Sequence, residues 1–152
     1  MISGGFAARI YGSVRELADI DIVIPEINFD EILSEVKECV TFGPAQYKDE
    51  NWDLWLMTLC YKEQEIDICG AHEAQIYDKK CEEWVWLETN FSISDTKEIF
   101  GIEVPVVPKD ELITNKSKLR REVDLLDIAD IISPTLYLLL SDPLTNSLEG
   151  IQ

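Results

Sequence analysis

The sequence lacks long apolar runs, a targeting segment and closely spaced cysteines. No apolar run approaches the roughly 20 residues that a membrane-spanning helix needs, and the N-terminus has no basic region followed by a hydrophobic stretch. We therefore expect a cytoplasmic protein without a membrane segment. The four cysteines form no C-x-x-C pair, which disfavours a zinc site and predicts reduced thiols in or near the core. They are Cys39, Cys60, Cys69 and Cys81.

Basic residues are also scarce. The chain has 13 Lys and Arg against 30 Asp and Glu, a formal net charge of −17. A protein that binds a nucleic-acid backbone must neutralise phosphates, so this charge disfavours nucleic acid as a partner, although the basic stretch 116–121 could form a local patch. A small charged substrate carried with Mg²⁺ fits the composition better. The single histidine, His72, has no partner motif, which indicates a structural or surface role.

The length and apolar content predict one folded domain. A chain of 152 residues with 46% hydrophobic residues and four tryptophans can bury a core and is not wholly disordered. We expect this single domain over residues 1–141 and a tail over 142–152. The tryptophans are expected to cover the sheet or the rim of a cleft, with core packing favoured. They are Trp52, Trp55, Trp84 and Trp86.

Alternation, turn residues and prolines predict a mixture of helices and strands. In the first half we expect a short helix at 6–11, a buried strand at 19–24, a helix from Asn28 or Asp30 to about Cys39, and a hairpin of strands 54–61 and 65–69 with its turn at 62–64. The stretch 71–95 is mixed. In the second half we expect a strand at 102–107 and two helices from Lys109, the second interrupted or restarted by Pro134.

Two aspartates flank one isoleucine at the start of the predicted strand 19–24. A strand points alternate side chains to the same face, so Asp19 and Asp21 share one face while Ile20 and Ile22 share the other. Two neighbouring carboxylates repel each other unless a cation or a proton lies between them. The spacing therefore predicts a bound cation or a retained proton at this strand.

A third carboxylate lies on the second strand of the predicted hairpin. In EQEIDICG, Glu65 and Asp67 fall on the same face, and pairing of this strand with strand 19–24 would bring Asp67 to Asp19 and Asp21. Three such carboxylates form a site for one or two Mg²⁺ ions, which prefer hard oxygen ligands; Mn²⁺ takes the same ligands. Such a site can stabilise an in-line displacement at phosphorus, and the third carboxylate can take a proton from an attacking hydroxyl.

The glycine pair Gly4-Gly5 precedes these acids at a predicted strand-to-helix turn, where backbone amides can approach a phosphate closely. With this pair, the spacer 6–18 and the acids Asp19, Asp21 and Asp67, the chain resembles the DNA-polymerase-beta-like nucleotidyltransferase superfamily. Its signature is a glycine pair or Gly-Ser, a short spacer, Asp-x-Asp or Asp-x-Glu, and a third acid on a later strand. The resemblance implies an α+β fold: a small mixed β-sheet flanked by helices, with the C-terminal helices packed on it. Only three residues precede the glycine pair, so we expect a shortened first strand.

A second stretch, ELITNKSKLRREVDLLDIADI, is similar to the C-terminal segment of small bacterial and archaeal members of the superfamily. Leu-Ile, a lysine, an arginine and two aspartates recur there along a helix; the matching positions are Lys116, Arg121, Asp124 and Asp127. At about 100° per residue they span about 140° of a helix, which is one face. We expect Lys116 to face the acid cluster while apolar residues pack inward. These are Ile113, Leu125, Ile128 and Ile131 or Ile132.

Each charged residue around the acid cluster has two interpretations. Lys116 and Arg121 either contact phosphates or form a solvated helix face, and the aspartates after them can simply pair with these bases. Arg15, four residues before Asp19, either neutralises the acids or binds a triphosphate.

The resemblance implies an enzyme that moves a nucleoside monophosphate from a nucleoside triphosphate to a hydroxyl. The acceptor would be a small molecule or a protein side chain, and a protein partner, as in toxin–antitoxin or abortive-infection pairs, or a homo-oligomer fits the superfamily. The alternative is a weakly active or inactive module of the same fold that acts as a binding partner. Retained clustered acids favour the enzyme, because unused neighbouring carboxylates cost stability.

Overall fold

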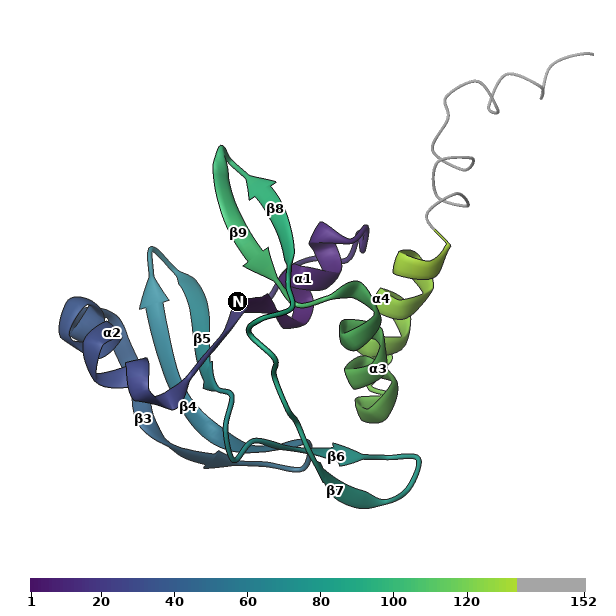
Figure 1. Cartoon of the computed structure of the whole chain (residues 1–152), viewed down its shortest axis with the longest axis horizontal. Helices are drawn as coiled ribbons and strands as arrows, with labels where there is room; N and C mark the ends of the chain where they lie inside the picture. The colour runs from purple at the N-terminus through teal and green to yellow at the C-terminus, as the bar shows by residue number, and fades with distance from the viewer. Residues whose placement is uncertain (134–152) are drawn as a thin grey trace, which may run out of the picture.

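The structure is a computed structural model that describes residues 1–133. Within this range the chain forms a mixed sheet with helices at both of its ends (Figure 1). The helices are α1 (Gly4–Ile10), α2 (Phe29–Val36), α3 (Lys109–Leu119) and α4 (Glu122–Ile132), with 3-10 turns η1 (Glu26–Asn28) and η2 (Lys37–Cys39). The strands are β1 (Ile2–Ser3), β2 (Asp19–Ile24), β3 (Val40–Lys48), β4 (Trp52–Tyr61), β5 (Gln64–Gly70), β6 (Gln75–Asp78), β7 (Glu83–Trp86), β8 (Asp95–Ile99) and β9 (Ile102–Val106).

The strands of this described range form one nine-stranded sheet in the order β7-β6-β4-β5-β2-β1-β9-β8, with β3 paired to β4. The β2–β5 and β1–β9 pairs are parallel, and the other pairs are antiparallel. The α+β class agrees with the prediction, but the predicted small sheet is wrong. The sheet is larger because β3, β6, β7 and β8 were not expected.

β1 contains two residues, yet it lies inside the sheet between β2 and β9. Ile2 faces Ile22 of β2 in antiparallel register and Val106 of β9 in parallel register. The chain passes directly from Ser3 into α1, so the glycine pair follows an interior strand of the sheet. This placement fixes the start of α1 next to β2.

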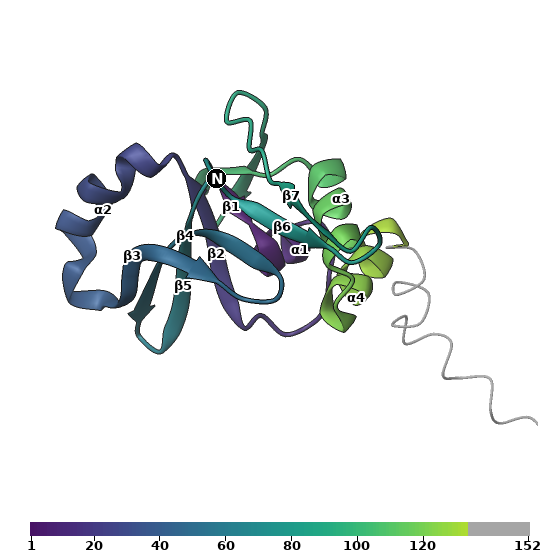
Figure 2. The same cartoon turned by 90° about the horizontal axis from the view of Figure 1, so that it is seen from below.

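Two apolar clusters hold the helices. α2 packs against one face of β2, β4 and β5 through a cluster of five buried residues: Ile24, Phe29, Met57, Leu59 and Ile68. α1, α3 and α4 gather at the other end of the molecule (Figure 2) around Ala7, Ala8, Val106, Val107, Leu112 and Ile131. Because side chains alternate along a strand, the face of β2 and β5 that carries Asp21 and Asp67 is opposite the face covered by α2.

Several predicted elements are confirmed. β2 has the predicted bounds, the 54–61 and 65–69 strands pair as a hairpin, and strand 102–107 is β9. α1 begins at Gly4 rather than after the glycine pair. The hairpin turn is one residue shorter than predicted, since Tyr61 pairs with Gln64 and only Lys62 and Glu63 turn the chain.

Other expectations are wrong. The charged C-terminal residues do not share one helix: Arg120 adopts a left-handed conformation, with φ of 53°, and separates α3 from α4. Leu125 is 49% exposed and does not pack inward, whereas Ile131 is fully buried. Trp55 and Trp86 are exposed, and so are Cys60 and Cys81, so core packing fails for these four. The proposed effect of Pro134 and the tail at 142–152 lie outside the described residues.

No helix within residues 1–133 combines the length and the apolar composition needed to cross a membrane.

Candidate functional site

The three predicted acids meet on one face of two adjacent strands. In the parallel β2–β5 register Asp19 faces Glu65 and Asp21 faces Asp67. One carboxylate oxygen from each of Asp19, Asp21 and Asp67 lies within 4.8 Å of the other two. The predicted geometry is therefore present, and the three oxygens are close enough to share one cation.

Burial and mutual repulsion make these acids hard to ionise together. Burial raises the pKa of Asp21 to about 6, assisted by the charges of Asp19 and Asp67 and opposed by the Gly5 N–H and by Lys116. Burial also raises the pKa of Asp67, assisted by Asp19. These raised pKa values agree with the retained proton that the spacing of Asp19 and Asp21 predicts, but burial rather than repulsion is their largest cause. A bound cation would favour the charged forms of both groups.

The glycine pair is required by what lies next to it. Gly4 has φ of 56°, and a Cβ there would stand 1.7 Å from Asp21 Oδ2. A Cβ on Gly5 would stand 2.5 Å from Arg15 Nη2, and the Gly5 N–H donates a hydrogen bond to Asp21 Oδ2 at 3.3 Å. The start of α1 is therefore in direct contact with the acid cluster on one side and with an arginine on the other.

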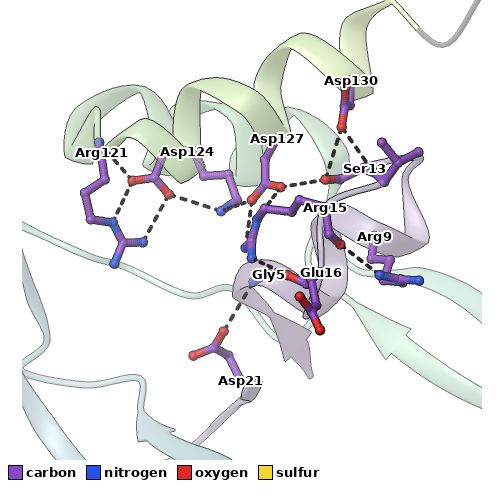
Figure 3. A network of polar contacts seen from close by, with 12 residues as sticks. Gly5, Arg9, Ser13, Arg15, Glu16, Asp21, Arg121, Asp124, Asp127 and Asp130 are labelled. Atoms are coloured by element: carbon purple, nitrogen blue, oxygen red, sulfur yellow. Dashed lines mark hydrogen bonds and ion pairs between the residues drawn. The ribbon is translucent and has the colours of Figure 1, made fainter. Parts of the chain in front are cut away.

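Arg15 binds an aspartate of α4 and does not pair directly with Asp19. Its Nε lies 2.7 Å from Asp127 Oδ1 and its Nη2 lies 3.1 Å from Asp127 Oδ2, a bidentate pair (Figure 3). Nη1 donates to the carbonyl of Glu16 at 3.1 Å. The position of Arg15 is thus set from α4, although the guanidinium also lies against Gly5.

Lys116 is buried between two aspartates. Its side chain is 4% exposed, and Nζ lies 3.2 Å from Asp124 Oδ1 and 2.8 Å from Asp127 Oδ2. Both aspartates are fully buried. Although burial acts to raise their pKa values, hydrogen bonds and nearby positive charges outweigh it and lower the pKa of each. A solvated helix face is therefore the wrong interpretation for Lys116.

Arg121 completes the same set of ion pairs at the start of α4. Nε lies 2.7 Å and Nη2 3.1 Å from the two oxygens of Asp124, and the side chain is 37% exposed. The aspartates after the basic stretch do pair with its bases, as one interpretation held. The break at Arg120 turns α4 so that Lys116 of α3 can reach both aspartates.

Several residues of the site were not identified from the sequence. Ser13 Oγ donates to Asp127 at 2.7 Å, and the N–H of Val14 donates to Asp130 at 3.0 Å, so α4 also holds the loop between α1 and β2 (Figure 3). The available signal was an aspartate at every third position of α4: Asp124, Asp127 and Asp130.

Thr58 is the other residue that was missed. Its hydroxyl donates to Asp67 Oδ1 at 2.6 Å, and the two residues face each other across the β4–β5 hairpin. A two-residue turn at Lys62-Glu63 implies this pairing, whereas the predicted three-residue turn shifts the register and hides it. His72 is exposed and pairs with Glu26, away from the acids.

Two surface hollows flank the segment after β7. One, of about 390 Å³, lies between this segment and α3; the other, of about 360 Å³, lies between it and the segment that follows β5. Trp86, Leu87 and Glu88 line both, and none of the three acids lines either. The acid cluster is therefore distinct from these hollows within the described residues.

Comparison with known proteins gives one structural likeness. No family model matches the chain, and no curated protein matches its sequence. A crystal structure from Thermotoga maritima, described as that of a candidate nucleotidyltransferase, matches with a TM-score of 0.61 at 16% identity, covering 92% of this chain and 81% of that chain. At this identity the likeness shows the fold alone. The chain has a nucleotidyltransferase-like fold, and its three clustered carboxylates have a geometry that can hold a metal ion.

Proposed function

We propose that this protein is a nucleotidyltransferase that moves a nucleoside monophosphate from a nucleoside triphosphate to a hydroxyl and releases pyrophosphate. The observation that carries the proposal is the meeting of Asp19, Asp21 and Asp67 within 4.8 Å on adjacent strands of a nucleotidyltransferase-like fold. The acceptor is a small molecule or a protein side chain. The superfamily resemblance of the glycine pair and of the 111–131 segment supports the same reaction.

The donor set of the acid cluster fits Mg²⁺, or Mn²⁺ in its place. All three donors are carboxylate oxygens, and the raised pKa values of Asp21 and Asp67 describe a group of acids that a divalent cation would stabilise in the charged form. When bound, the metal neutralises charge on the phosphate oxygens and aligns them for displacement. Asp19 and Asp21 hold it, and Asp67 is the third ligand or the base.

The chain's own residues supply the base and the phosphate contacts. Asp67, fixed by Thr58, accepts the proton of the acceptor hydroxyl when it acts as the base. Gly4 and Gly5 let the backbone come close to the phosphates. Arg15, which lies against Gly5, and Arg121, which feels the charges of Asp21 and Asp19, are the phosphate ligands. Lys116 contributes its charge rather than a direct contact, because its ammonium lies between two buried aspartates.

The partners that we propose are a nucleoside triphosphate, the acceptor, and either a protein partner or a second copy of the chain. A role in a toxin–antitoxin or abortive-infection pair belongs to the same proposal and rests on the superfamily resemblance alone. The alternative function is a binding module that keeps the fold without useful catalysis.

The test is transfer from labelled nucleotides. Protein is incubated with Mg²⁺, a cell extract and each common ribonucleoside triphosphate labelled at its α-phosphate, and both pyrophosphate release and labelled products are followed. We expect transfer with the parent and none with an Asp19→Asn/Asp21→Asn variant, while Glu35→Gln, at an exposed position of α2, behaves as the parent. Binding of nucleotide without transfer would favour the module. If the nucleotides neither bind nor are transferred, both the enzyme and the binding-module interpretations of the site are overturned.

A further inference from the structure

The ion pairs between α3, α4 and the loop before β2 form one connected set, which we call the α4 charge network: Arg15, Lys116, Arg121, Asp124 and Asp127. We propose that Asp124 and Asp127 are positioning residues that hold Arg121 and Arg15 in place as two preset ligands for the triphosphate, with Lys116 as their buried counter-charge. This inference rests on the proposed function and deepens it.

The two aspartates use the same geometry. Asp127 binds the Nε and Nη2 of Arg15, and Asp124 binds the Nε and Nη2 of Arg121. Each also accepts from Lys116, so one ammonium bridges both pairs. A bidentate pair fixes the plane of a guanidinium. Without such a pair, ordering the arginine around a ligand would cost side-chain entropy at the moment of binding.

The bidentate pairs leave part of each guanidinium for another ligand. In Arg15, Nη1 donates to the Glu16 carbonyl and Nη2 to Asp127, so each of these nitrogens has one further N–H for a ligand. Nη2 adjoins Gly5, whose N–H reaches Asp21. Nη1 of Arg121 makes no hydrogen bond to any residue of the described range, and the side chain is partly exposed. The pKa of Arg121 is raised first by its hydrogen bond to Asp124 and also by the charges of Asp21 and Asp19, which places it within the field of the acid cluster.

Lys116 sets the net charge of the network. Two arginines and two aspartates alone would be neutral, and Lys116 makes the set of three cations and two anions net positive by one. A triphosphate beside the three acids needs this excess, because phosphate oxygens and carboxylates repel each other. Lys116 thus acts on the ligand through the two aspartates and through its charge.

The network also connects parts of the chain that are distant in sequence. Asp127 accepts from both Ser13 and Arg15, and Asp130 accepts from the N–H of Val14, so α4 holds residues 13–15 of the loop that precedes β2 (Figure 3). Arg121 is placed by the first turn of α4, where Asp124 also accepts from its backbone N–H at 3.1 Å. Docking of α4 therefore orders Arg15, whereas Arg121 is held within α4 itself.

The test measures affinity for inorganic tripolyphosphate in Mg²⁺, a probe with no base or ribose, by calorimetry on the full chain. We expect Arg15→Lys and Arg121→Lys each to weaken binding about tenfold, because each variant keeps the charge but loses the planar guanidinium with its paired N–H donors. Arg120→Lys, an exposed neighbour, is the matched control and should bind as the parent.

The positioning role is tested by coupling. Asp127→Asn should weaken tripolyphosphate binding, and its effect should be much smaller in the Arg15→Lys background, whereas a general loss of structure would weaken binding equally in both. If Asp127→Asn does not fold, the tripolyphosphate affinities of the two arginine variants still test the inference. Parent-like binding by Arg15→Lys and Arg121→Lys would overturn the inference and leave the proposed function standing, whereas a parent that binds no tripolyphosphate would overturn both.

Discussion

Asp21 lies directly across the parallel β2–β5 pair from Asp67, and both side chains leave the sheet on the face that α2 does not cover. Hydrogen bonds between the strands fix the separation of the two backbones, so the carboxylates cannot relax their repulsion by moving the strands apart. The negative charge must therefore be balanced by a bound cation or a retained proton. Both can be measured, as metal binding and as a shifted pKa.

Removal of the charges should change the response to metal. An Asp19→Asn/Asp21→Asn variant should be at least as stable as the parent without metal, because it loses the repulsion. The parent should gain melting temperature as Mg²⁺ is added, and the variant should gain almost nothing. Thermal melts over a Mg²⁺ series check this, with Glu35→Gln as the surface control. Equal gains in parent and double variant would show that these acids are not a metal site.

The titration of Asp21 should appear in the stability of the metal-free protein. Its folded-state pKa of about 6 exceeds the ordinary value of 3.8, so the folded state holds the proton more tightly than the unfolded state does. The resulting stabilisation is present at low pH and is lost as pH rises from about 4 to above 6. Relative to Asp21→Asn, the parent should lose of the order of 2 to 3 kcal/mol across this window. Denaturant melts of both proteins at several pH values measure the difference, and a flat difference would contradict the shift.

Gly4 should tolerate no side chain. Gly4→Ala adds a Cβ at the position of the Asp21 carboxylate and also strains a backbone with positive φ. Gly101 also has positive φ, but nothing lies within 4 Å of its Cβ position, so Gly101→Ala isolates the backbone cost, about 1 kcal/mol. Urea melts should show a clearly larger loss for Gly4→Ala, together with a loss of the Mg²⁺ response. Equal losses for the two variants would mean that the contact with Asp21 does not matter.

Thr58 should tune the third carboxylate. Its hydrogen bond lowers the pKa of Asp67, so Thr58→Val should raise that pKa and weaken Mg²⁺ binding by about tenfold or more, in the range found when a metal ligand loses its outer hydrogen bond. Thr58→Ser keeps the hydroxyl and is the matched control. Calorimetric Mg²⁺ titrations compare the three proteins, and parent-like affinity in Thr58→Val would remove Thr58 from the site.

The parts of the fold that were predictable carry local signals. The strand at Asp19–Ile24 alternates acid and isoleucine and stops at Pro25, which is sufficient to bound it. β3 contains Gly43-Pro44, and β8 is short and polar, so neither has the alternation that marks a half-buried strand. These strands are held by their neighbours rather than by their own pattern.

The same division applies to the site. The three acids were predictable because strand periodicity and one parallel pairing bring them together. The pairing of Arg15 with Asp127 was not, because it depends on how α4 turns after Arg120, and an arginine in the left-handed conformation has no sequence signature. Tertiary packing therefore determines the pairing of Arg15 with Asp127, which local sequence patterns do not predict.

The brevity of β1 bears on the order in which the molecule folds. β3, β4 and β5 are joined by short connections and can pair at little cost in chain entropy, whereas Ile2 meets Val106 only after nearly the whole described chain has been brought together. β1 also pairs with β2, where Ser3 faces Asp21, so the approach of the glycine pair to Asp21 needs only this short-range pairing and not the meeting of β1 with β9. A chain arrested before β1 meets β9 could therefore already hold the start of α1 and Asp67 beside Asp21, and it would still lack the pairing of β1 with β9.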